Sequence, residues 1–295
     1  MLDNGLVWTG LHGTSSKFSV VADIDHNGQD DLVVDFGAAY GIWIYMNNTN
    51  WVQLHGGTSS RIAVGDFDRN GQDDLVVDFG PQYGIFLYRN NTRWTHIHAT
   101  SSKLITVADI DRNGQDDIVI DFGSGNPVGA PNGIWIYKSN GNNGTWVQLH
   151  SVTAREMVAG DVDKNGHDDL VVDFGPDYGT FVWLNNSTWK HINPLSGRRM
   201  VTADIDGNGA DDLVMDFGAG YGIFAYMNNS NWVQLYGTPS TGMAVADLDG
   251  NGRADVIVDF GSAYGMYAYM NGGPTWRALH NISSSYIATG EVNGN

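Results

Sequence analysis

Six copies of one Asp-rich loop constrain this 295-residue chain more than any other feature. The loops begin at Asp23, Asp66, Asp109, Asp161, Asp204 and Asp247, in steps of 43, 43, 52, 43 and 43 residues. The first reads D-I-D-H-N-G-Q-D-D, and all six share their first, third, fifth, sixth and ninth residues. Oxygen ligands at alternate positions around a glycine turn are typical of a hard-cation site, and a period near 43 is typical of propeller blades.

Each repeat contains four strand-like segments. In the first repeat these are Phe18–Ala22, Leu32–Phe36, Tyr40–Tyr45 and Trp51–His55, separated by Gly- and Asn-rich turns. β-branched and aromatic residues with this punctuation are typical of strands. The second segment is too continuously apolar to have a solvent face, as in a blade that is covered by neighbours on both sides. We therefore predict an all-β, single-domain propeller over residues 1–295, with four-stranded blades.

The blade count depends on how the ends are interpreted. Complete repeats span about 18–55, 62–98, 105–150, 157–193, 200–236 and 243–280, and a partial seventh combines 287–295 with 6–12. Glu291, Asn293 and Asn295 match the alternate ligand places of the loop. A seven-bladed design is preferred, with six blades as the alternative. Ser124–Asn132 adds nine residues to the third repeat, either as a neutral surface insertion or as an elaborated binding loop.

The acidity of the chain is concentrated in the repeat. The formal charge is −18, and 29 of the 33 acidic residues lie in the six loops or in the V-D-F-G segment that follows each loop. Six divalent ions would reduce the net charge to about −6. No Lys/Arg cluster offers a counter-charge to phosphates, which excludes nucleic acid as the expected partner. The chain contains no cysteine, which excludes disulfides and thiolate metal sites.

The loop chemistry favours calcium, about one ion per complete repeat. Three carboxylates, one amide, one backbone carbonyl and water make a plausible calcium shell, whereas zinc would prefer Cys or His. An isolated D-x-D-x-N-G segment would be an Asx turn, but six copies in register favour metal. The candidate ligands are Asp23, Asp25, Asn27, Gln29 and Asp31; Asp66, Asp68, Asn70, Gln72 and Asp74; Asp109, Asp111, Asn113, Gln115 and Asp117; Asp161, Asp163, Asn165, His167 and Asp169; Asp204, Asp206, Asn208, Ala210 and Asp212; and Asp247, Asp249, Asn251, Arg253 and Asp255.

The sixth loop separates the roles of the paired aspartates. Ala254 replaces the eighth-position Asp there, while Asp255 keeps the ninth. The ninth residue is therefore the predicted ligand, and the eighth is a turn or supporting residue.

The loop, the following D-F-G and the blade-length period resemble FG-GAP (VCBS-type) repeats, found in integrin α-subunit propellers and integrin-like fungal lectins. The resemblance covers nearly all of residues 8–295. It implies a β-propeller with calcium in the hairpin loop between the first two strands of each blade. Asn at the fifth position, where such loops often carry Asp, departs from the pattern and implies weaker affinity.

Other features have simpler interpretations. The Asp of each D-F-G is predicted to cap backbone groups, with channel lining or ligand contact as the alternative. His96 and His98 lie on one strand face, where a strand-surface role is favoured over a transition-metal site. Six of the seven N-glycosylation sequons belong to the Asn-rich turns, whose hairpin chemistry explains them.

The function expected from the sequence is binding, not catalysis. No nucleophile–base constellation stands apart from the repeat, and the ten Trp residues include candidates for stacking on sugar faces. We expect a lectin-like module whose partner is a glycan or an extracellular protein surface. The alternatives are a structural or protein–protein interaction propeller with architectural calcium, or an accessory domain of a larger secreted enzyme.

The expected setting is secreted or cell-surface, because acidic calcium loops fill best where free calcium is plentiful. Met1 is followed by no signal-like segment, and no apolar run approaches membrane-spanning length. We therefore expect no membrane insertion, and either a removed signal or a segment of a longer protein.

Overall fold

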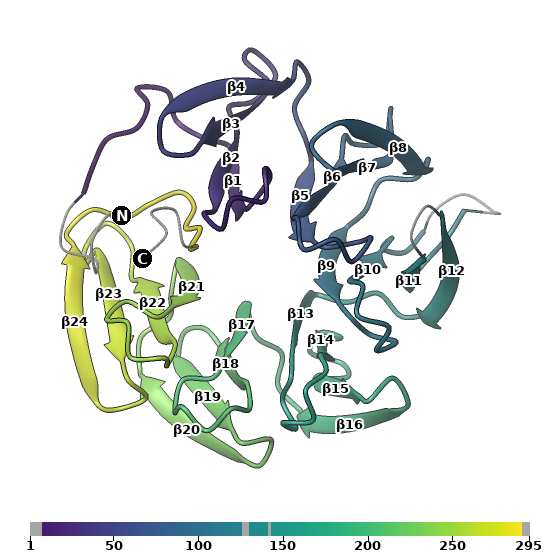
Figure 1. The fold of residues 1–295 in the computed structure, drawn as a ribbon. Helices are drawn as coiled ribbons and strands as arrows, with labels where there is room; N and C mark the ends of the chain where they lie inside the picture. Colours follow the sequence, from purple (N-terminus) through teal and green to yellow (C-terminus); the bar gives the residue numbers. More distant parts are fainter. Residues whose placement is uncertain (1–7, 126–129, 141–142, 291–295) are drawn as a thin grey trace. The chain divides into compact units, whose positions relative to one another are not determined.

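The computed structural model describes residues 8–125, 130–140 and 143–290, and all regular structure in them is β (Figure 1). None of the described residues forms a helix long and apolar enough to cross a membrane. The 24 strands form six antiparallel four-stranded sheets, each built from strands that are consecutive in the chain. This is the up-and-down order of a propeller blade.

The chain divides into two compact units, each described here by itself. The unit with residues 14–157 holds three sheets: β1 Phe18–Ala22, β2 Asp31–Asp35, β3 Ile42–Met46 and β4 Asn50–His55; β5 Arg61–Gly65, β6 Asp74–Asp78, β7 Ile85–Arg89 and β8 Arg93–His98; and β9 Leu104–Ala108, β10 Asp117–Asp121, β11 Ile134–Asn140 and β12 Asn143–His150.

The second unit covers residues 158–289 together with the N-terminal segment up to Gly13. Its sheets are β13 Glu156–Gly160, β14 Asp169–Asp173, β15 Thr180–Leu184 and β16 Thr188–Asn193; β17 Arg199–Ala203, β18 Asp212–Asp216, β19 Ile223–Met227 and β20 Asn231–Tyr236; and β21 Gly242–Ala246, β22 Asp255–Asp259, β23 Met266–Met270 and β24 Thr275–His280.

The cores lie between neighbouring sheets. Every residue of β6, β10, β14, β18 and β22 is buried. Val33 of β2 and Leu75 and Val77 of β6 belong to one apolar cluster that joins the first two sheets. The prediction that the second strand has no solvent face is therefore confirmed for these five strands, because residues on both of their faces are buried.

The seven-bladed preference is wrong for the described residues, which contain six four-stranded sheets. Residues 8–12 and 287–290 of the predicted partial repeat form no strand, and residues 6, 7 and 291–295 lie outside the described residues. Trp8 instead packs on His280 with ring centroids 4.9 Å apart, and its Nε1 donates to the Leu279 carbonyl at 3.2 Å. Without two middle strands to pair with, this segment cannot build a sheet.

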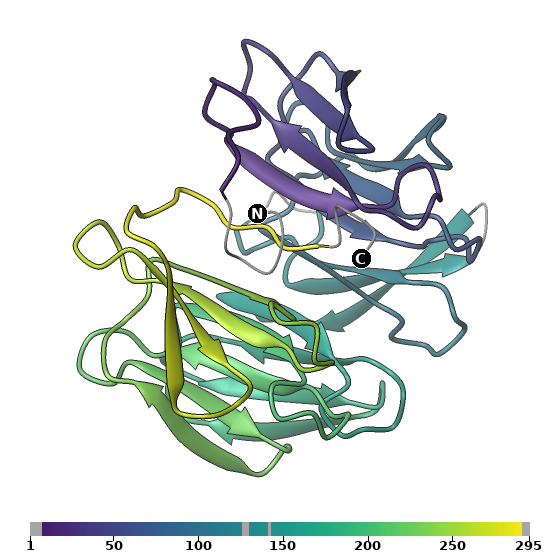
Figure 2. The same cartoon turned by 60° about the vertical axis from the view of Figure 1, so that its left-hand side comes forward.

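The two ends of each blade differ in content. The Asp-rich loop joins the first two strands, and the Asn-rich turn joins the last two, so antiparallel pairing brings both to one end. The connections after the second and fourth strands lie at the opposite end. Figure 2, the same ribbon turned by 60°, shows loops joining the strands at their ends. Gly41 is required there, because its φ is +80° and a Cβ would lie 2.3 Å from the His55 carbonyl oxygen.

Candidate functional site

Each Asp-rich loop is closed by its first aspartate. Asp23 accepts hydrogen bonds from the amides of Asn27 at 3.0 Å and Gly28 at 2.8 Å. The φ angles of His26 and Gly28 are +59° and +84°, so the chain turns sharply within the loop. Equivalent bonds from the fifth and sixth residues recur in the other five loops. In the second to sixth loops the turn brings the alternate carboxylates close together; Asp23, Asp25 and Asp31 of the first loop do not meet the same distance criterion.

The first, third and ninth aspartates form carboxylate clusters. In five loops, one oxygen from each of the three residues lies within 4.8 Å of the other two. These clusters are Asp66, Asp68 and Asp74; Asp109, Asp111 and Asp117; Asp161, Asp163 and Asp169; Asp204, Asp206 and Asp212; and Asp247, Asp249 and Asp255. Among the predicted ligands, these are the residues that the structure brings together most closely.

The ninth aspartate is buried, and in four loops only one of its two carboxylate oxygens accepts a hydrogen bond. Oδ1 of Asp74 accepts the Asn90 amide at 2.9 Å, whereas Oδ2 has no hydrogen-bond partner although the residue is 1% exposed. Oδ2 of Asp117, Asp169 and Asp212 is orphaned in the same way. A buried carboxylate oxygen without a partner is costly. A cation in the loop would satisfy it.

Burial dominates the electrostatics of these carboxyls. It raises the pKa of Asp74 and Asp117 to about 7, and the neighbouring carboxylates add to the effect. Burial likewise raises the pKa of Asp169 and Asp212 to about 6. An oxygen-only, acidic, partly buried donor set fits a hard divalent cation such as calcium.

The fifth-position asparagines hold the loop shape. The amide oxygen of Asn27 accepts the Gln29 backbone N–H at 2.8 Å, and the same bond recurs for Asn70, Asn113, Asn208 and Asn251. The amide nitrogen of Asn165 donates to Asn185 in the following turn at 2.7 Å. These side chains are therefore engaged within the loop and with the turn. The seventh residues, Gln29, Gln72, Gln115, His167, Ala210 and Arg253, lie beside them, and their predicted role through the backbone carbonyl stays a prediction.

Sequence reasoning missed the Asn-rich turn as part of the site. The Asn47 backbone amide donates to Asp31 at 2.8 Å, and its side chain donates to Asp25 at 2.8 Å. Asn90, Asn185, Asn228 and Asn271 bridge the third and ninth aspartates of their own blades in the same way. Their φ angles lie between +50° and +57°, which confirms the hairpin interpretation. The constant spacing of 22 residues from the third Asp was the signal.

In the third blade, two residues replace the single Asn that bridges the third and ninth aspartates. Ser139, near the end of β11, donates its backbone amide to Asp117 at 2.8 Å. Lys138 Nζ lies 3.7 Å from Asp111 Oδ2, an ion pair in place of the amide contact.

The eighth aspartate joins adjacent blades. Asp73 accepts the backbone N–H of Asp23, the first residue of the preceding loop, at 2.8 Å. The backbone N–H of Asp73 donates in return to the Asp23 carbonyl at 3.2 Å. Burial raises the pKa of Asp73, and carboxylates of both adjacent loops add to the rise. The predicted supporting role therefore has a definite form, a contact between blades.

The strand aspartates are caps, as predicted. Asp35 is fully buried and accepts the Gly37 and Ser59 amides at 2.7 Å each, together with the hydroxyls of Thr58 and Ser59. Asp78, Asp121, Asp173 and Asp216 hold the connection to the following sheet in the same way, and Asp259 accepts the Ser284 amide in the segment after the last strand.

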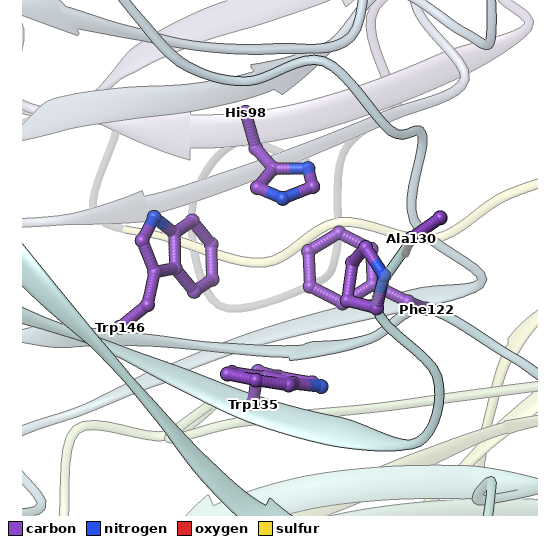
Figure 3. A pocket seen from close by; sticks show the side chains of 6 residues that line it. His98, Phe122, Ala130, Trp135 and Trp146 are labelled. Carbon is purple, nitrogen blue, oxygen red and sulfur yellow. The ribbon is translucent and has the colours of Figure 1, made fainter. Parts of the chain in front are cut away.

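An aromatic pocket of about 350 Å³ lies between the second and third sheets (Figure 3). It is lined by His98, Phe122, Ala130, Pro131, Trp135 and Trp146. Figure 3 shows the His98 ring opposite Trp135, with Trp146 and Phe122 on either side. Ala130 and Pro131 come from the nine-residue insertion, so part of that segment lines a concave surface.

The polar groups of the pocket are few and uncharged. His98 Nδ1 accepts the Thr100 amide at 3.0 Å, and burial lowers the pKa of His98. Trp135 Nε1 donates to the Asn132 carbonyl at 2.9 Å. His96 packs on Phe86 of its own sheet, whereas His98 packs on Phe122 of the next. The two histidines therefore have the packing roles favoured over a metal pair.

Comparison with known proteins identifies the fold. No family model matches the chain, and no curated protein matches it. Among solved structures, an Agrocybe aegerita lectin studied for specific recognition of non-reducing terminal N-acetylglucosamine has TM-score 0.64 and 20% identity, covering 91% of this chain and 81% of its own. BBS1N in complex with ARL6DN has TM-score 0.61 and 15% identity, covering 88% and 80%. The extracellular domain of the hybrid two-component system BT4673 from B. thetaiotaomicron has TM-score 0.54 and 13% identity, covering 95% and 35%. The chain is thus an all-β propeller fold with four-stranded blades.

Proposed function

We propose that this protein is a non-enzymatic, calcium-binding propeller that binds carbohydrate in aromatic pockets between its blades. The observation that carries the proposal is the uncharged pocket walled by Trp135, Trp146 and Phe122. Its volume falls at the lower end of small-ligand sites, roughly 300–1,000 Å³. The similarity of fold to a lectin that recognises N-acetylglucosamine supports the same ligand class.

The pocket chemistry suits a neutral sugar. Aromatic faces pack against the C–H face of a pyranose, while the His98 imidazole is placed to exchange one hydrogen bond with a hydroxyl or acetamido group. No charged side chain lines the pocket among the described residues, so an anionic ligand would gain no counter-charge there.

Calcium is proposed as a structural ion. The first, third and ninth aspartates of each loop would hold it, and its charge would satisfy the orphaned oxygen of the ninth. The buried Asp residues of the second strands serve as loop-closing and cap groups, which supports a structural use of these carboxylates. A secreted or cell-surface setting, where calcium is abundant, is proposed with it.

Glycan-array binding followed by calorimetry with N-acetylglucosamine tests the proposal. Trp135→Ala should abolish binding at this pocket, because it removes the aromatic wall that lies opposite His98. Trp135→Phe is the matched control, since Phe86, Phe181 and Phe224 occupy the equivalent place in other blades. The absence of binding to any glycan in calcium would refute the carbohydrate assignment.

A second candidate function is binding to a protein surface. Tyr40, Tyr83, Tyr178, Tyr221 and Tyr264 share one place in five blades and are 53–64% exposed. Such aromatics favour protein contacts. Retention of a partner by the wild type but not by a protein with all five replaced by Ser would distinguish this function from sugar binding.

A further inference from the structure

The eighth-position aspartate reaches a neighbouring metal loop at three places. Besides Asp73 to Asp23, Asp116 accepts the Asp66 N–H at 2.9 Å and Asp211 accepts the Asp161 N–H at 3.0 Å. The backbone bonds return at 3.0 Å from Asp116 and 2.8 Å from Asp211. Two such contacts lie in the unit of residues 14–157 and one in the unit of residues 158–289.

The position of this residue in its own loop makes the contact a link between cation sites. Asp73 precedes Asp74, which closes the carboxylate cluster of the second loop. Its partner Asp23 is the first candidate ligand of the first loop. One dipeptide therefore touches two sites, with Asp73 holding a ligand residue of one loop and Asp74 belonging to the other.

Glycine precedes the first aspartate at two of the three contacts, whereas Ala22 precedes Asp23 at the third. A Cβ at Gly65, the residue before Asp66, would lie 2.8 Å from Asp116 Oδ2. At Gly160, before Asp161, it would lie 2.5 Å from Asp211 Oδ2. Glycine at these two positions leaves room for the neighbouring carboxylate.

A second contact runs between the same loops in the other direction. His26 Nδ1 lies 2.5 Å from the Gly71 carbonyl oxygen, and Arg69 Nη1 donates to the Asn113 carbonyl at 3.1 Å. Lys164 donates to the Asn208 carbonyl. Fourth-position side chains thus hold the middle of the next loop, so neighbouring loops are joined at both their edges.

The sixth blade lacks the carboxylate link. Ala254 keeps the backbone bond to the Asp204 carbonyl at 3.0 Å, but has no side-chain acceptor for the Asp204 N–H. The chain itself thus contains one natural junction without the carboxylate.

We propose that Asp73, Asp116 and Asp211 are positioning residues that couple neighbouring cation sites, so that calcium binds cooperatively between adjacent loops of each unit. The coupling rests on the proposed calcium binding. It is weakest between the fifth and sixth loops, where Ala254 replaces the aspartate.

The physical origin of the coupling is shared ordering. A cation in the second loop fixes Asp74, and with it the acceptor that Asp73 offers to the Asp23 amide. The first loop is then ordered before its own cation arrives, and part of its ordering cost is already met. Linkage requires the effect to be reciprocal, so either loop helps the other.

Calcium titration calorimetry of the whole chain, with melting curves in EDTA and in calcium, tests the proposal. The wild type should bind with positive cooperativity. Asp73→Ala should weaken calcium binding at the first two loops by roughly five- to tenfold while keeping the stoichiometry. Asp73→Asn keeps an acceptor oxygen and should restore most of the affinity. Ala254→Asp should add the missing link and tighten binding in the fifth and sixth loops several-fold.

The melting curves separate coupling from general stability. A merely structural role predicts the same loss of melting temperature for Asp73→Ala with and without calcium, whereas coupling predicts a larger loss in calcium. Independent sites with unchanged affinity in Asp73→Ala and in Ala254→Asp would overturn the coupling and leave the calcium assignment intact. Absence of any calcium heat in the wild type would overturn both. If Asp73→Ala fails to fold, the calcium affinity of Ala254→Asp tests the coupling: tighter binding supports it, and unchanged binding overturns it.

Discussion

Single carboxyl groups decide how each loop responds to its surroundings. The ninth aspartate is buried beside two other carboxylates, with one oxygen held by a backbone amide and the other free in four of the described loops. Burial raises the pKa of this carboxyl, so the folded state holds its proton more strongly than the unfolded chain does, whereas a bound cation would favour the charged form. Acidity and calcium are therefore opposing influences on the same residue.

The first prediction concerns pH. Burial raises the folded-state pKa of Asp74 and Asp117 from 3.8 to about 7. The folded protein then holds more protons than the unfolded chain between about pH 4 and pH 7, so the stability from these groups is complete below pH 4 and is lost as the pH rises to 7. Each pKa unit corresponds to about 1.4 kcal/mol. Melting temperature in EDTA should fall across this range, and calcium should remove the fall; a flat profile in EDTA would contradict the assignment.

The second prediction is that a substitution at Asp74 changes the unfolding free energy in opposite directions with and without calcium. Asp74→Asn removes the charge but keeps the size of the side chain. In EDTA at pH 7 we expect stabilisation by about 1 kcal/mol, because the cost of burying the charge is removed, together with the repulsion from Asp68 and Asp66. In calcium we expect destabilisation of similar size, together with loss of one bound ion, measured by denaturant titration and calorimetry. A variant that changes stability equally in both conditions would contradict a ligand role.

At the scale of a strand and its connections, the blade has a carboxylate-loop end and a cap end. The Asp at the end of each second strand binds the backbone of the segment that leads into the next sheet. Asp78, for example, accepts the Gly80 and Ser102 amides at 2.8 and 2.6 Å and two serine hydroxyls. One buried side chain thus fixes the connection between two blades.

The third prediction follows from that cap. Asp78→Ala leaves buried donors without acceptors and should cost about 2–4 kcal/mol of unfolding free energy. Calcium affinity should be unchanged, since the substitution lies at the end of the blade away from the loop. Denaturant titration with calorimetry checks both quantities. Asp177→Ala, in an exposed turn, is the control and should have little effect.

At the scale of the whole molecule, the charge distribution concentrates carboxylate repulsion in the loops, which the proposed cations would relieve. Most of the −18 formal charge lies in or near the loops. Within each unit the neighbouring loops contact one another, so their carboxylates repel across blades as well as within them.

The fourth prediction is therefore made for the intact chain. EDTA should lower the melting temperature by ten degrees or more, since ligands that bind only the folded state stabilise it by mass action, about 2.7 kcal/mol at a hundredfold excess over Kd for each site. Added calcium should restore it, and magnesium should do so less well because of its stricter geometry. Differential scanning calorimetry measures the effect, and an unchanged melt would refute structural calcium.

Periodicity predicted what is local and repeated. The loop and the buried second strand follow from residue pattern alone, and Ala254 correctly separated the eighth aspartate from the carboxylate clusters. The bridging role of Asn47 was not predicted, because its partners lie in a different hairpin. The pocket depends on which aromatic rings two neighbouring sheets bring together. The blade count depends on whether the segment that contains Trp8 has two middle strands to pair with. The spacing of the repeats predicts neither the pocket nor the blade count.

The separation of the two blade ends has a practical consequence for measurement. The pocket is lined from the ends of β8 and β10, from the β10–β11 connection, and by Trp135 of β11 and Trp146 of β12, whereas the carboxylate loop of the same blade joins β9 to β10 beyond the other end of β10. A luminescent lanthanide in that loop would report on occupancy without competing with a sugar. The lanthanide luminescence would then report on the third loop while the pocket lined by Trp135 and Trp146 stays open to a sugar.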